Sequence, residues 1–99
     1  MPQFLASYDL TNTFPSPYAP FIEQTIPRGW SPWIPVQNGQ AYRLPNTTVQ
    51  GDFPTLEAAV AELEAARAAT ARAIGKIVEM PKWIVTEASN AIVASDEQR

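Results

Sequence analysis

The residues that are best able to bind a metal or take part in catalysis lie at the end of the first apolar segment. Gln3 to Leu10 reads QFLASYDL and ends in Tyr8-Asp9-Leu10, just before the polar stretch TNTFPSP. A metal-dependent nuclease uses carboxylates to hold Mg²⁺ on a phosphate and to lower the pKa of the attacking water. Asp9 is therefore the candidate catalytic and metal-binding residue. Because one carboxylate supplies too few ligands, this hypothesis needs Asp9 from two subunits around one ion.

Asp9 also has a purely structural explanation. An Asp at the end of a strand, followed here by Thr11-Asn12-Thr13, often accepts backbone N–H bonds in the turn. This explanation requires no ligand, and we favour it over the metal site.

Three further residues are candidate nucleic-acid contacts: Tyr8, Tyr42 and Arg43. Aromatic rings stack on unpaired bases, and an arginine contacts phosphate. The competing interpretation is that the aromatic residues pack in the core or at an interface, and that Arg43 is a solvated strand residue.

The composition excludes several kinds of site. The chain has no cysteine and no histidine, which removes disulfides, thiolate chemistry, most zinc sites and the Ser-His-Asp triad. A net charge of −3, with the seven basic residues spread along the chain, argues against broad electrostatic binding of nucleic acid. We therefore expect no cofactor, with Mg²⁺ required only under the nuclease hypothesis.

Ninety-nine residues predict a single domain, which we place at residues 1–88, with a tail at 89–99. No stretch approaches the roughly 18 apolar residues of a membrane span, and no basic region precedes the first apolar run. The expected location is cytoplasmic.

The first half of the chain predicts strands and one short helix. Gln3–Leu10 has apolar residues on both faces, as in a central strand. Ser16-Pro17 is a good helix start, and Pro27 and Gly29 end the helix. Its expected core face has helical spacing: Tyr18, Phe21, Ile22, Thr25 and Ile26.

A hairpin is expected next. Trp30–Val36 carries Pro32 and Pro35 and so suits only an edge strand. Asn38-Gly39 is a strong hairpin signal, and the returning strand runs from Ala41 to about Gln50, with an irregularity at Pro45.

One long helix dominates the second half. Thr55 is a suitable cap, and the helix ends either at Gly75 or near Glu79. Lys82–Ala88 is the last strand. The short apolar run Ala91–Ala94 is either frayed or an extra strand that pairs with a partner's sheet edge.

The order strand, helix, strand, strand, helix, strand predicts a ferredoxin-like α+β sandwich, with sheet order 4-1-3-2 and both helices on one face. Its other face would then be uncovered. If Trp33 or Trp83 lies there, the exposed patch is larger than a monomer usually tolerates, which favours a homodimer.

Several segments resemble a known family. FLASYDL at the end of a first strand, AYRLPNTTV as a third strand and Val85-Thr86-Glu87 in the last are similar to small proteins related to two groups. These are the CRISPR-associated adaptation endoribonuclease and the type V endoribonuclease antitoxins. The resemblance implies a homodimer that binds or cleaves RNA, with the carboxylate of Asp9 holding a metal at the dimer axis.

Three functional hypotheses follow. The first is a non-enzymatic dimeric protein with a regulatory, toxin–antitoxin-like or defence role. The second is a magnesium-dependent endoribonuclease that uses Asp9 from both subunits. The third is a small-molecule or peptide binding module on the open face of the sheet.

Overall fold

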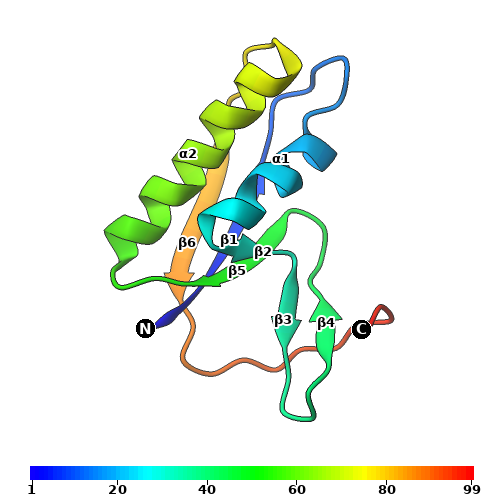
Figure 1. Cartoon of the computed structure of the whole chain (residues 1–99), viewed down its shortest axis with the longest axis vertical. Helices are drawn as coiled ribbons and strands as arrows, with labels where there is room; N and C mark the ends of the chain where they lie inside the picture. Colours follow the sequence, from blue (N-terminus) through cyan, green and yellow to red (C-terminus); the bar gives the residue numbers. More distant parts are fainter.

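The structure, a computed structural model, describes residues 1–99 and has an α+β architecture (Figure 1). The main sheet has four antiparallel strands in the order β2-β5-β1-β6, and α1 and α2 both lie on one face of it (Figure 1). The prediction of a four-stranded antiparallel sheet with two helices is confirmed. The elements of this body are β1 (Gln3–Asp9), α1 (Tyr18–Thr25), β2 (Trp30–Ser31), β5 (Thr48–Asp52), α2 (Leu56–Ile74) and β6 (Lys82–Glu87).

The strand β1 is central and supplies much of the core. Phe4, Ala6 and Tyr8 alternate along it and are buried under the helices, as the period of two residues requires. The ring of Tyr8 packs on Phe21 of α1, with ring centroids 4.5 Å apart. Leu10 continues the same buried row just after the strand ends.

The helix α1 begins at Tyr18, directly after Ser16 and Pro17, and it buries Phe21 and Thr25 completely. After Thr25 the backbone tightens into the 3₁₀ turn η1 (Ile26–Arg28). The change of helical pitch rotates Ile26 out of the apolar face, so its side chain is exposed. Its predicted place in the core is wrong for this reason.

The helix α2 has the ends that the sequence indicates. The Thr55 side chain accepts a hydrogen bond from the backbone N–H of Ala58 at 3.0 Å. Gly75, with a φ of 67°, ends the helix, and its N–H donates to the carbonyl of Ala71. The longer alternative, continuation to Glu79, is therefore excluded.

The hairpin is divided into two parts. The outer part forms a separate two-stranded sheet, β3 (Trp33–Pro35) with β4 (Ala41–Arg43), below the main sheet in Figure 1. The breaks fall at Pro32 and at Leu44 to Thr47. The prediction of one uninterrupted strand over Trp30–Val36 is therefore wrong, whereas the irregularity expected at Pro45 is present and divides the returning strand into β4 and β5 (Thr48–Asp52). Proline offers no ladder N–H, and instead the carbonyl of Pro32 accepts from the N–H of Leu44 at 2.8 Å.

The end of the tail pairs with this hairpin. Ala41 and Arg99 exchange backbone hydrogen bonds of 2.7 and 2.9 Å, and the Arg43 N–H donates to the Glu97 carbonyl at 3.0 Å. The Arg99 guanidinium lies over the Trp33 ring, 4.4 Å from its centroid. The run Ala91–Ala94 has no regular structure, so no strand forms there within this chain.

Close packing beside β2 explains why position 51 is a glycine, and it leaves the indole N–H of Trp30 without a hydrogen-bond partner. Trp30 is 1% exposed and lies opposite Gly51 in the β2–β5 ladder. A Cβ at Gly51 would collide with the carbonyl oxygen of Gly29 and would lie 2.7 Å from the Phe53 ring. The indole N–H of Trp30 is buried with no hydrogen-bond partner.

Candidate functional site

Asp9 lies exposed at the end of β1, opposite Lys82 in the β1–β6 ladder and on the sheet face away from the helices. Its carboxylate accepts no hydrogen bond. The following turn is held instead by the Tyr18 hydroxyl, which binds the N–H and carbonyl of Leu10 at 3.0 and 3.1 Å. The prediction that Asp9 closes the turn is therefore wrong.

The surroundings of Asp9 contain no further acidic ligands. No three His, Cys, Asp or Glu side chains come together as a possible metal site anywhere in the chain. A shared ion between two subunits stays a prediction.

The structure brings Tyr8 and Arg43 together, although they are far apart in sequence. Both line a pocket of about 430 Å³ between the end of β1, the first turns of α1 and the loop after β4. We call this the Tyr8 pocket, and its walls are Tyr8, Tyr18, Ala19, Ile22, Arg43, Asn46 and Thr47. Tyr42 is not part of it and lies in a groove between the hairpin and the tail, with Ile34 and Val93.

The hydroxyl of Tyr8 has an unusual environment. The residue is only 3% exposed, and its hydroxyl, which forms no hydrogen bond within the chain, borders the pocket. Burial raises the pKa of Tyr8, the nearby Arg43 guanidinium partly lowers it, and the Tyr18 hydroxyl adds to the increase. The phenol is therefore neutral at physiological pH and is a free hydrogen-bond donor.

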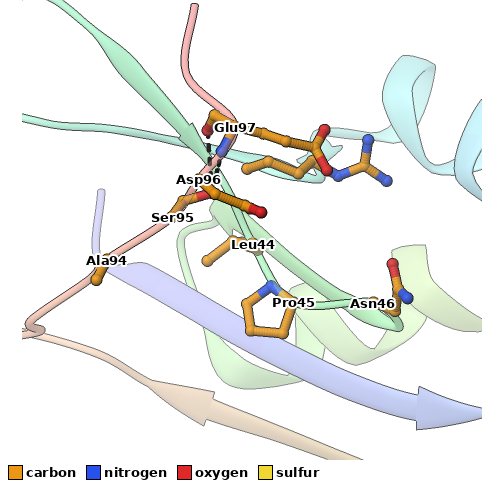
Figure 2. A pocket seen from close by; sticks show the side chains of 8 residues that line it. Leu44, Pro45, Asn46, Ala94, Ser95, Asp96 and Glu97 are labelled. Carbon is orange, nitrogen blue, oxygen red and sulfur yellow. Dashed lines mark hydrogen bonds between the residues drawn. The ribbon is translucent and has the colours of Figure 1, made fainter.

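Arg43 stands between the Tyr8 pocket and a second pocket. This second pocket, of about 600 Å³, is formed by the loop Leu44–Asn46 and the tail residues Ala94–Glu97 (Figure 2). In the tail, the Ser95 hydroxyl donates to the Glu97 carbonyl and accepts from the Glu97 N–H, both at 3.0 Å (Figure 2). Asp96 and Glu97 place two carboxylates on this side of Arg43.

Sequence reasoning missed Asn46, Thr47 and the acidic tail as parts of this region. The asparagine and threonine are positioned by a loop in which Thr47 has a φ of 62°. A left-handed conformation is rare for a β-branched residue and leaves no pattern in the sequence. The contacts of the tail with β4 join residues more than fifty positions apart.

The face of the main sheet without helices is mostly polar. Leu5 and Ile84 are its larger apolar side chains; the polar ones are Gln3, Ser7, Asp9, Thr48, Gln50, Asp52, Lys82 and Thr86. Trp83 lies directly opposite Tyr8 in the β1–β6 ladder, so its side chain is on the helix side of the sheet. Trp33 belongs to the separate sheet. The expectation of a tryptophan on the open face is wrong, and this face offers no broad apolar platform for a ligand.

The outer edge of β6 is the most apolar exposed feature of the sheet. β6 is the last strand in the order, so one side of its backbone is unpaired. Trp83 and Ile84 in its middle are 49% and 61% exposed. Trp83 also borders a small apolar cavity of about 200 Å³ against Leu63 and Met80.

No family model, no curated protein and no solved structure matches this chain. Neither helix has the length and apolar character needed to cross a bilayer. The geometry of the chain's own residues is therefore the basis for assigning a function.

Proposed function

We propose that this chain is a non-enzymatic, homodimeric protein of ferredoxin-like fold with a regulatory role, and that the dimer forms by pairing of β6 with its copy. The fold assignment is supported by the strand order. If β2 and β3 are taken as one interrupted strand, and β4 and β5 as the next, the order β6-β1-β5-β2 corresponds to 4-1-3-2.

The unpaired edge of β6 is the observation that carries the proposal. The Ala88 N–H donates to the Gln3 carbonyl at 2.8 Å, which sets the alternation of hydrogen bonds along β1 and β6. By that alternation, the N–H and C=O groups of Trp83, Val85 and Glu87 point outward. Monomeric proteins usually protect such edges with charges, prolines or bulges, but the middle of β6 reads Trp-Ile-Val-Thr.

The edge is also self-complementary. In a two-fold antiparallel pairing that extends the sheet, residues directly opposite each other lie on the same face. The two-fold axis must therefore pass at a residue rather than between two residues. In the middle of β6 that residue is Ile84 or Val85. The axis at Ile84 places Ile84 against its copy and Trp83 against the partner's Val85. The axis at Val85 would place Trp83 opposite a carboxylate, Glu87. We therefore expect the axis at Ile84.

The absence of cysteine makes this dimer directly testable. At the proposed axis, opposite Cα atoms are about 4.5 Å apart, within the range that a disulfide spans. Under mild oxidation, Ile84→Cys is expected to give a covalent dimer, whereas Gln37→Cys at the exposed hairpin tip is not.

The wild-type chain is expected to sediment as a dimer at micromolar concentration, and Ile84→Lys, which places two exposed lysines opposite each other at the axis, as a monomer. Crosslinking through Val85→Cys in preference to Ile84→Cys would move the axis by one residue. A monomeric wild-type chain would contradict the proposal.

The same dimer bears on the nuclease hypothesis. With the axis at Ile84, three strand spacings and four residues of offset separate the two Asp9 residues, a distance of roughly 20 Å. That is far too long for two carboxylates to share one metal ion. The β6 dimer and the Asp9 metal site are therefore mutually exclusive.

An RNA cleavage assay distinguishes the non-enzymatic dimer from the nuclease hypothesis. We expect no magnesium-dependent cleavage of structured or single-stranded RNA by the wild-type chain. Cleavage that disappears in Asp9→Ala would overturn the non-enzymatic assignment, because only the nuclease hypothesis gives Asp9 a chemical role.

A further inference from the structure

We propose that the Tyr8 pocket binds a small organic monoanion: a carboxylate joined to an aromatic or branched aliphatic body. The pocket lies on the helix side of the sheet and away from the β6 edge, so this site is independent of the proposed dimer.

The pocket has the size of a small-molecule site. Its volume of about 430 Å³ lies within the range of roughly 300–1,000 Å³ typical of such sites. At about 30 Å³ for each water molecule, it has room for about fourteen waters, or a ligand with a similar number of heavy atoms. The Tyr18 ring, Ala19 and Ile22 form an apolar wall suited to the body of the ligand.

The polar wall consists of free donors. The Tyr8 hydroxyl forms no hydrogen bond within the chain and borders the pocket, so it is free to donate to a ligand. The Arg43 guanidinium forms no ion pair. The one salt bridge of the chain joins two other residues, Arg67 and Glu64. The Asn46 amide is free as well. No carboxylate lines the pocket, and its one charged group is a guanidinium, so the site favours an acceptor or an anion.

The charge balance selects a monoanion. Arg43 is the one cationic side chain of the pocket. A guanidinium binds a carboxylate through two parallel hydrogen bonds. On its other side lie Asp96 and Glu97, whose negative charge disfavours a phosphate dianion or an RNA strand (Figure 2). A single carboxylate fits this balance better than either.

Tyr8 and Tyr18 are held in place before any ligand binds. The Tyr8 ring is fixed against Phe21, and its backbone N–H donates to the carbonyl of Thr47 at 3.1 Å. The Tyr18 hydroxyl is fully engaged by Leu10, which fixes the apolar wall. Such preorganisation lowers the entropy that binding costs.

Calorimetric titration with indole-3-acetate, and with its uncharged amide as the matched control, tests the ligand class. We expect the carboxylate to bind and the amide to bind at least tenfold more weakly, because the amide cannot pair with Arg43. Equal affinity for both would overturn the proposal. Tighter binding of inorganic phosphate or of a short single-stranded RNA would also overturn it, in favour of a phosphate site.

Two variants test the assigned donors. Tyr8→Phe keeps the ring against Phe21 and removes only the hydroxyl, and Arg43→Gln removes the charge. Each is expected to weaken indole-3-acetate binding about tenfold. Arg72→Gln, on the exposed side of α2, removes the same charge elsewhere and should leave the affinity unchanged.

Circular dichroism of each variant verifies that it is folded. Unchanged affinity in folded Tyr8→Phe, or no binding of indole-3-acetate or benzoate by the wild-type chain at millimolar concentration, would refute the site. Loss of the β6 dimer would leave these results unaffected, so the two proposals can fail separately.

Discussion

The helix-covered body and the hairpin lobe are stabilised by different interactions, although one hairpin runs through both. The body consists of β1, β2, β5, β6 and the two helices, and it contains a cluster of 12 buried apolar residues. The hairpin lobe consists of β3, β4 and residues 97–99. In β3 and β4 only Ile34 is buried, with Leu44 just beyond. Backbone hydrogen bonds and the stacking of Arg99 on Trp33 hold the lobe together.

This difference shows how two proline-containing breaks separate a structure into parts with different stability. The body gains from apolar burial and should unfold cooperatively. The lobe has little apolar burial and should open locally at a lower free energy. Each of the following changes tests that division.

The largest expected effect is in the body core. Phe21 is fully buried and packs on Tyr8, so Phe21→Ala is expected to lower the free energy of unfolding by about 3–5 kcal/mol. Urea unfolding followed by circular dichroism measures this loss. Ile92→Ala, in the exposed tail, is the control and should change the stability by less than about 0.5 kcal/mol. Similar losses in both variants would contradict the division.

A smaller loss is expected from overpacking beside β2. In Gly51→Ala the new methyl group collides with the Gly29 carbonyl and the Phe53 ring, so we expect a loss of about 1–3 kcal/mol in the same urea experiment. Thr48→Ala in the same strand faces the open side and should cost less. Wild-type stability of Gly51→Ala would show that the β2–β5 contact is loose.

Tyr8 lies at the boundary of body and lobe, and its burial predicts that the chain loses stability at alkaline pH. Burial raises its pKa in the folded chain, whereas the unfolded chain releases the proton near pH 10.0. Below that pH, the contribution of the Tyr8 pKa shift to the free energy of unfolding is fully present. Above it, stability should fall by up to about 1.4 kcal/mol per pH unit. Urea midpoints at pH 9, 10 and 11 measure the slope, which Tyr8→Phe should reduce; equal slopes would count against the burial of this hydroxyl.

The smallest global effect is expected in the lobe. Deletion of residues 97–99 removes three backbone hydrogen bonds to β4 and the stacking on Trp33. The free energy of global unfolding should change by less than about 1 kcal/mol, while amide hydrogen exchange at Ala41 and Arg43 accelerates at least tenfold. Arg99→Gln keeps the backbone bonds and should accelerate exchange less. A large global loss would mean that body and lobe unfold together.

The body was predictable because its signals are local. The alternation of Phe4, Ala6 and Tyr8 indicates a strand with one buried face, and the Thr55 cap and Gly75 terminator fix the ends of α2. Each of these depends on side chains within a few residues of the element that they define.

The lobe was not predictable, because the effect of its prolines depends on partners distant in sequence. Pro32 was expected at an edge of a continuous strand. The separation from the body depends on the bond from Leu44 to the Pro32 carbonyl and on the conformation of Thr47. Neither leaves a pattern in the sequence.

The candidate site was predicted in part. Tyr8 and Arg43 were identified from their chemistry, but their shared pocket depends on how the hairpin folds back over β1. Asp9, the most suggestive residue in the sequence, is a solvent-exposed carboxylate without a hydrogen bond. A residue's chemical type indicated what it can do, and only the fold determined which neighbours it has.

The solitary indole N–H of Trp30 has a spectroscopic consequence. The three tryptophans report on three different places: Trp30 in the body core, Trp33 beneath two guanidinium groups in the lobe, and Trp83 at the β6 edge. Trp30, without a polar partner, should emit at the shortest wavelength, and its indole proton should exchange only when the core opens. The chain thus carries its own set of fluorescent reporters, one for each region whose behaviour is in question.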